Sequence, residues 1–309
     1  MKLGVVSSIF KNYDFDKMID VVASLGLTCI EASAWPKIKT SRRYAGVQHI
    51  DPEKVIKDSK YRKHIIEYSK MKNVEIASLG YHANILDGNI KNRNNNITHL
   101  KKCIVAAYHL NVKMVTCFIG RDQNKNIEEN IEIVKKVWPS ILNVAKKYDI
   151  RLAIENCPML FTKNEWPGGQ NIMSNPELWN QIFKMLDSEY LGLNYDPSHF
   201  VWQMLDYIKP IKEFKNKIWQ LHIKDVKLHK EKLERCSILS YPLNFMTPKL
   251  PGLGDIDWDL FIKEIKKIKY DSYAILEIED KDFENNDKQI ITAIKKSKKF
   301  ILDKGLLKG

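Results

Sequence analysis

The chain has 309 residues, of which 44% are hydrophobic and 28% charged, with 13 glycines and 11 prolines. This composition excludes collagen-like, disordered and disulfide-stapled chains, and it allows a sizeable core. The formal net charge is +12, but residues 1–150 carry +10 and residues 151–309 only +2, so acidic side chains gather in the second half. We therefore interpret the basic excess as a solvated surface and expect no nucleic-acid partner.

The five cysteines form no C-x-x-C pair and no zinc-finger spacing, which predicts free thiols in a reducing compartment. The first residues lack the apolar stretch of a signal peptide. No run of about 18 apolar residues occurs, so no membrane span is expected. These features predict a cytoplasmic protein.

Short apolar segments alternate with longer amphipathic segments along the whole chain. The expected strand and helix pairs are, in chain order, 3–7 with 15–24, 29–32 with 52–71, 75–79 with 98–110, 114–118 with 128–147, 151–155 with 176–186, 191–195 with 208–214, 219–223 with 260–268, and 274–278 with 288–302. Strict alternation favours parallel strands, and eight pairs is the number that closes a TIM barrel. We predict an α/β protein with one (β/α)8 barrel domain over residues 1–309. An open doubly wound sheet is the alternative.

Three strand-to-helix connections are too long for simple turns: residues 33–50, 156–175 and 226–258. In a barrel such connections lie at the C-terminal face, where active sites are built. Four metal-ligand side chains end late strands at this face: Glu155, Asp196, His222 and Glu277. Three carboxylates without a basic partner would repel one another, and a divalent cation would remove that repulsion.

This oxygen-rich ligand set suits Mn²⁺ best, and Mg²⁺, Co²⁺ and Zn²⁺ remain open. His199 follows Asp196 by three residues and is expected near the substrate or behind a ligand. Lys224 shares a strand face with His222, so it is expected to contact a substrate oxygen. A surface ion pair with Asp225 is the alternative for Lys224.

Earlier strand ends supply a further wall for a polyhydroxylated ligand. We expect substrate contacts from Glu31, His82 and Asn84, and a sugar-stacking surface from Trp35. The sequence contains no phosphate-loop, H-E-x-x-H or G-x-S-x-G motif, so these three kinds of site have no support.

Together these residues resemble the xylose-isomerase-like TIM barrels of the sugar phosphate isomerase/epimerase superfamily. The resemblance is carried by Ile-Glu-Asn at 154–156, Asn-Tyr-Asp-Pro-Ser-His at 194–199, His-Ile-Lys-Asp at 222–225, Pro-Gly-Leu-Gly-Asp-Ile-Asp-Trp at 251–258 and Leu-Glu-Ile-Glu-Asp at 276–280. It implies one divalent metal held by the four ligand residues, with His199 near the substrate. Residues 43–46 and 168–171 are similar to segments in one branch of this superfamily, whose members act on free sugars, 3-keto sugars and glycosides.

The resemblance implies a metal-dependent sugar isomerase or epimerase that removes a proton next to a carbonyl and passes through an enediolate. Glu155 and Glu277 are expected as the base and the acid. Returning the proton to the other face epimerises the substrate, returning it to the neighbouring carbon isomerises it, and losing a β-hydroxyl dehydrates it. A hydratase or lyase acting on a keto-sugar is therefore an alternative.

Two other functions are weighed from the same residues. An abasic-site DNA endonuclease like endonuclease IV would need further histidines at the fourth strand end and before the last strand. The chain has none at 116–120 or 255–258. A non-catalytic sugar-binding subunit is the third hypothesis. The expected partner is a small carbohydrate, and a homo-oligomer is left open.

Overall fold

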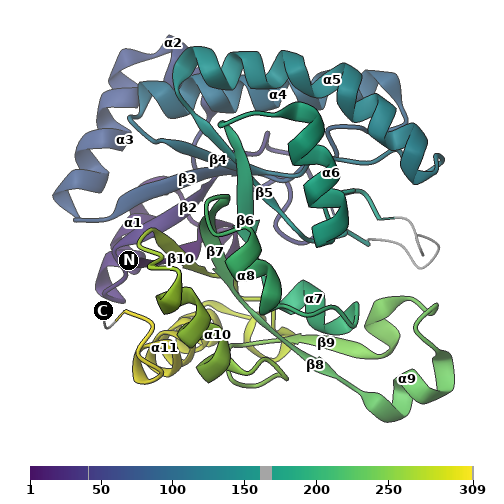
Figure 1. Cartoon of the computed structure of the whole chain (residues 1–309). Coiled ribbons are helices and arrows are strands. Elements are labelled where there is room, and N and C mark those ends of the chain that lie inside the picture. The colour runs from purple at the N-terminus through teal and green to yellow at the C-terminus, as the bar shows by residue number, and fades with distance from the viewer. Residues whose placement is uncertain (41, 161–168, 308–309) are drawn as a thin grey trace.

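The structure is a computed structural model that describes residues 1–40, 42–160 and 169–307. Eight parallel strands close into a barrel in the order β1-β10-β7-β6-β5-β4-β3-β2 (Figure 1). The predicted (β/α)8 TIM barrel is confirmed. The barrel strands are β1 (Lys2–Val6), β2 (Cys29–Ser33), β3 (Glu75–Tyr81), β4 (Met114–Cys117), β5 (Arg151–Glu155), β6 (Leu191–Tyr195), β7 (Ile218–Ile223) and β10 (Tyr273–Leu276).

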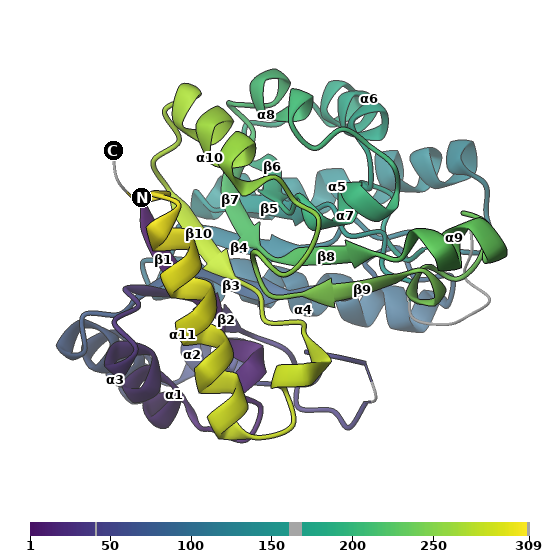
Figure 2. The same ribbon diagram turned by 90° about the horizontal axis from the view of Figure 1, so that it is seen from below.

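Helices surround this barrel, as the two views in Figures 1 and 2 show. They are α1 (Phe15–Ser24), α2 (Pro52–Lys57), α3 (Ser59–Met71), α4 (Ile90–His109), α5 (Ile127–Tyr148), α6 (Pro176–Leu186), α7 (Ser198–Trp202), α8 (Lys209–Glu213), α9 (Lys230–Cys236), α10 (Trp258–Lys267) and α11 (Asp287–Asp303), with short 3₁₀ turns η1 (Ser7–Phe10), η2 (Pro242–Asn244) and η3 (Lys281–Phe283). In the described part of the chain, no helix has the length and apolar character needed to cross a membrane.

The barrel strands are buried on both faces, and β2 and β6 are buried along their whole length. The barrel strands are mostly apolar because helices cover them outside and side chains fill the barrel inside. The described residues include all five cysteines, and each is a free thiol, as predicted. The prediction of one domain over residues 1–309 stays a prediction.

Two helix predictions were wrong in their limits. The helix expected over 52–71 is divided at Asp58, whose side chain accepts hydrogen bonds from the backbone N–H groups of Lys60 and Tyr61 and so caps a new helix. The helix expected from 98 begins at Ile90, capped by Asn89. Its first two turns are rich in asparagine, and this polar run hid the helical pattern.

The connection expected as a long loop over 226–258 contains its own structure. Strands β8 (Asp225–Leu228) and β9 (Met246–Lys249) pair as an antiparallel hairpin, with α9 and η2 between them. Figures 1 and 2 show this hairpin and α9 extending away from the barrel strands. Asp225 anchors the hairpin by accepting hydrogen bonds from the backbone of Val226 and Gly252 and from the Trp258 indole.

Candidate metal centre and active-site cavity

The four expected metal ligands come together at the C-terminal end of the barrel. Glu155 ends β5, Asp196 follows β6, His222 lies in β7 and Glu277 follows β10. These strands are consecutive neighbours in the barrel, and each residue offers one ligand atom within 4.8 Å of the others. All four side chains are buried. The geometry therefore allows one divalent cation to contact all four.

The orientation of His222 is set from across the barrel. Its Nε2 lies 3.0 Å from the Glu31 carboxylate, so an Nε2–H can donate a hydrogen bond there. Its Nδ1 lies 3.4 Å from Glu277 Oε2 and 3.7 Å from Glu155 Oε1, and it has no hydrogen-bond partner among the described residues. A histidine fixed by a carboxylate on one nitrogen leaves the other nitrogen for a cation.

Lys224 places a positive charge beside the ligand carboxylates. Its Nζ lies 2.6 Å from Glu277 Oε2 and 3.1 Å from Asp196 Oδ2, and it also pairs with Glu279 at 3.1 Å. Burial lowers the pKa of Lys224, but these carboxylates outweigh burial and hold that pKa well above its ordinary value. The assumption that the three acids lack a basic partner was therefore wrong.

The alternative pairing of Lys224 with Asp225 is also wrong. Asp225 is fully buried, and its oxygens are used by the hairpin backbone and the Trp258 indole. The side chains of Lys224 and Asp225 point in opposite directions because the two residues are adjacent on an extended chain. The predicted contact of Lys224 with a substrate oxygen stays a prediction.

The charges of the cluster are mutually supporting. Burial raises the pKa of the Glu155 carboxyl, but His199 and His222 outweigh burial and hold that pKa well below its ordinary value. Burial likewise raises the pKa of Asp196, and Lys224 and His199 lower it overall. Burial lowers the pKa of His222, whereas Glu277 and Glu31 raise it well above its ordinary value. A proton on His222 would therefore offset part of the acidic charge.

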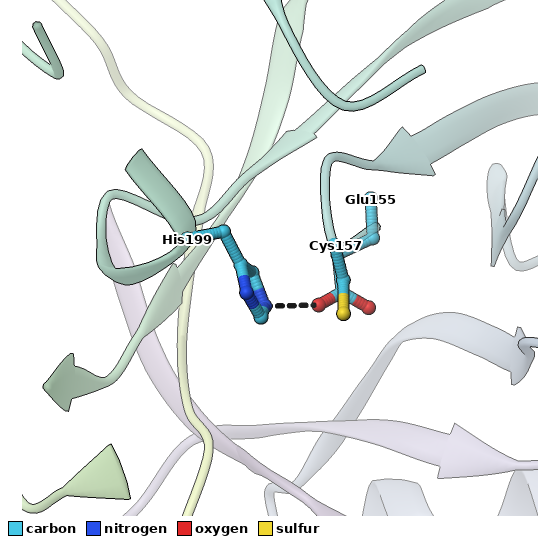
Figure 3. A group of neighbouring side chains, drawn as sticks. All are labelled: Glu155, Cys157 and His199. Carbon is cyan, nitrogen blue, oxygen red and sulfur yellow. Dashed lines mark ion pairs between the residues drawn. The ribbon is translucent and has the colours of Figure 1, made fainter. Parts of the chain in front are cut away.

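His199 joins the cluster from the first turn of α7. Its Nε2 lies 3.2 Å from Asp196 Oδ2 and 3.4 Å from Glu155 Oε1. Figure 3 shows the imidazole directed at the Glu155 carboxylate, with the Cys157 sulfur beside them. Glu155, Cys157 and His199 form a second group with metal-ligand spacing that shares Glu155 with the first.

The cluster opens into a cavity of about 570 Å³. Five of the six residues expected to contact substrate line this cavity: Glu31, Trp35, His82, His199 and Lys224. His82 Nε2 lies 3.6 Å from Glu155 Oε2, at the edge of the ligand group. Asn84 is absent from the cavity lining, and its side chain holds the backbone of Leu86 and Arg121. The structure therefore gives Asn84 a loop-bracing role in place of the expected substrate contact.

Two of the lining residues have further contacts inside the protein, and their expected substrate contacts stay predictions. Glu31 is 2% exposed and accepts hydrogen bonds from His222 and, at 2.6 Å, from Gln220. It therefore holds the ligand residue His222 from inside the barrel. The Trp35 ring is packed edge-on against Tyr81, and the Arg42 guanidinium lies 5.0 Å from its centre. A sugar would have to displace Arg42 to stack on that face of Trp35.

Sequence reasoning missed one carboxylate and one thiol that line the cavity. Glu279 was not among the predicted site residues, and it bridges Lys224 and Arg43 inside the cavity. Cys157 was set aside with the other cysteines, yet it lines the cavity beside His199. Their positions two residues after Glu277 and Glu155 were the available signal, because alternate residues near a strand end can share a face. Gly168, part of the 168–171 motif, lies outside the described residues.

A family model described as "Xylose isomerase-like TIM barrel" matches residues 19–300 of the chain. The chain belongs to this family. The resemblance inferred from the sequence motifs is therefore confirmed.

Two proteins of similar sequence are informative. The uncharacterized protein YfiH of Bacillus subtilis (strain 168) is 24% identical, over 91% of this chain and 93% of that protein. An inosose dehydratase of Clostridium perfringens (strain ATCC 13124) is 25% identical over 114 residues, which cover 35% of this chain and 37% of that enzyme.

Among solved structures, the IOLI protein with a bound zinc atom superposes with a TM-score of 0.72 at 21% identity, covering 98% of both chains. Other structures of similar fold include sugar 3-epimerases. At these identities the likeness shows the shared fold.

Proposed function

We propose that this protein is a divalent-metal-dependent isomerase or epimerase of a keto-sugar or glycoside, which removes a proton next to a carbonyl. The observation that carries the proposal is the group of buried ligand atoms from Glu155, Asp196, His222 and Glu277, all within 4.8 Å of one another. A buried cluster of acceptors is costly unless a cation or protons offset its charge.

The residues present fit a metal ion. Glu31 fixes His222 Nε2, and the buried Nδ1 is left without a hydrogen-bond partner among the described residues. The three carboxylates and one imidazole would hold the ion, and the oxygen-rich set favours Mn²⁺. Zinc is the alternative, supported by the zinc-bound IOLI protein. A divalent ion bound here would withdraw electron density from a substrate carbonyl and favour the enediolate.

Glu155 and Glu277 are the proposed base and acid. They enter the site from β5 and from the end of β10, with β6 and β7 between these strands in the barrel. Two carboxylates that reach one cavity from different strands can remove a proton from one position and return it to another.

Dehydration of a keto-sugar at the same site is the second candidate. The partial similarity to inosose dehydratase favours it. The first proton removal is the same in both reactions, and the outcome differs in whether a β-hydroxyl leaves. Product analysis separates the two: an isomer or epimer conserves the substrate mass, and a dehydration product loses one water.

Two measurements test the proposal. Metal analysis after manganese supplementation should give about one equivalent per chain, and His222→Ala should lose it. Keto-sugars incubated in deuterated water with the wild-type enzyme should exchange the proton next to the carbonyl, as followed by NMR. The exposed Glu177→Gln variant is the matched control and should behave as wild type. Less than half an equivalent of metal together with no exchange would contradict the proposal.

A further inference from the structure

The cavity has two halves of different chemistry. Its floor is formed by charged and histidine side chains: Glu155, His199, His222, Lys224, Glu277 and Glu279. One outer side, which we call the apolar wall, consists of six uncharged residues: Trp202, Val226, Tyr241, Leu243, Met246 and Pro248. These residues come from the end of α7, from the β8–β9 hairpin and from the turn that precedes β9.

The chain connects the apolar wall directly to the floor. His199 and Trp202 lie three residues apart on α7, so they are neighbours on one helix surface. Lys224 lies on the floor, and Val226, two residues later, lies in the wall. One ligand can therefore contact the charged floor and the apolar wall at the same time.

The apolar wall is built as a firm surface. Trp202 and Val226 form a small core with the buried Phe245, separate from the main barrel core, and Met246 packs against it. Leu243 remains 46% exposed at the rim. Trp202 and Val226 are buried, whereas Tyr241, Met246 and Pro248 are partly exposed. A partly exposed apolar surface that is braced from behind and borders a polar site is typical of a ligand subsite.

The polar groups around the wall are already engaged. The Thr247 hydroxyl is 2.8 Å from His229 Nε2, and the Tyr241 hydroxyl donates to the Leu160 carbonyl at 3.5 Å. The charged hairpin residue Lys249 pairs with Asp280 and Asp282. The wall thus favours an apolar group over further sugar hydroxyls, because the side chains of Val226, Leu243, Met246 and Pro248 offer a buried hydroxyl no strong hydrogen-bond partner.

We propose that the apolar wall is a subsite for a non-polar aglycone, so that the substrate is a glycoside rather than a free sugar. This inference rests on the proposed function, because the sugar ring must occupy the charged floor. The cavity volume of about 570 Å³ lies within the range of about 300–1,000 Å³ that holds drug-sized ligands. A sugar ring alone on the floor would leave the exposed Leu243 and the partly exposed Met246 in contact with water.

The test compares matched probes that differ in the aglycone. Phenyl and methyl β-glycosides of D-glucose, D-galactose and D-mannose are titrated into the manganese-supplemented protein, and binding is measured by calorimetry. For at least one sugar, the phenyl glycoside should bind at least about tenfold more tightly than the methyl glycoside. Equal binding within every pair, or no binding by any glycoside, would overturn the subsite.

Substitutions in the apolar wall test whether this wall causes the preference for phenyl glycosides. Leu243→Ser and Met246→Ser should each reduce the phenyl-to-methyl ratio by at least about threefold without changing methyl glycoside binding. Leu239→Ser is the matched control: Leu239 belongs to the same segment and is 70% exposed, but it is not among the residues that line the cavity. A phenyl preference that survives both wall substitutions would also overturn the proposal.

The failure of this inference and of the proposed function are distinguishable. A protein that binds its metal and exchanges a keto-sugar proton, but shows no phenyl preference, keeps the proposed function and loses the aglycone subsite. A protein that shows the phenyl preference but neither binds metal nor exchanges protons keeps the subsite and loses the proposed catalysis.

Discussion

Glu31 and His222 are hydrogen-bonded across the barrel at 3.0 Å, although their strands β2 and β7 are not neighbours. Gln220 donates to the same Glu31 oxygen, and Ser78 donates to Gln220. Gly80 leaves room for this arrangement, since a Cβ there would lie 2.7 Å from Glu31 Oε1. These hydrogen bonds inside the barrel therefore fix the orientation of the His222 ring.

This relationship predicts that Glu31→Gln weakens metal binding by about 10- to 100-fold, because the amide no longer accepts the Nε2–H bond as strongly. Gly80→Ala should weaken binding in the same direction by pushing the carboxylate away. Competition with a chelator of known affinity measures both. Unchanged affinity in both variants would show that Glu31 does not orient His222.

Glu155→Gln and Glu277→Gln should each lower turnover by about 10²- to 10⁴-fold, which is the usual contribution of a positioned acid or base. Deuterium exchange next to the carbonyl, measured under metal saturation, separates loss of proton transfer from loss of metal. If both variants retain more than about a tenth of wild-type exchange, neither glutamate is the base.

Lys224→Met should bind the divalent ion more tightly, by about tenfold, while turnover falls. The ammonium group lies 2.6 Å from Glu277 and 3.1 Å from Asp196, so it repels a second cation at these carboxylates. Lys113→Met, which removes an exposed lysine paired with Asp149, is the control and should leave the affinity unchanged. Weaker metal binding in Lys224→Met would contradict this electrostatic account.

His49 should make folding sensitive to acid. Its ring is buried, with Nδ1 2.9 Å from the Ser7 hydroxyl and Nε2 3.2 Å from the Phe10 carbonyl. Burial lowers the pKa of His49 from 6.5 to about 4, although the hydrogen bond to the Phe10 carbonyl acts in the opposite direction. Between these values the unfolded chain binds more protons than the folded chain, so stability falls as pH falls.

This His49 contribution is about 2 kcal/mol between about pH 7 and pH 5. Urea unfolding at the two pH values should show that His49→Gln loses less stability on acidification than wild type does, by about that amount. Equal losses would show that His49 is not the responsible group.

Asp225→Asn should lower the free energy of unfolding by about 3 kcal/mol, because one amide oxygen cannot replace a carboxylate that accepts from three backbone N–H groups and an indole. Asp303→Asn, on the exposed end of α11, should change it by less than about 1 kcal/mol. Denaturant titrations compare the two. An equally small effect at Asp225 would mean that the hairpin is anchored elsewhere.

Alternating apolar and amphipathic segments were sufficient to predict the barrel, because strand and helix periods are local properties of the chain. The same holds for Glu155, Asp196, His222 and Glu277, since residues at the ends of consecutive parallel strands must gather at one rim. Local patterns failed where polar caps divided or extended helices, as at Asp58 and Asn89.

Tertiary structure alone decided which polar groups pair. The roles of Glu31, Lys224 and Asn84 depend on strands and loops far apart in the chain, and a side chain near a rim can turn inward, outward or along it. Lys224 pairs with Glu277 and Asp196 and not with its sequence neighbour Asp225, because the side chains of adjacent residues on an extended chain point in opposite directions. The apolar wall likewise exists only because the β8–β9 hairpin folds beside α7, a contact that no local pattern encodes.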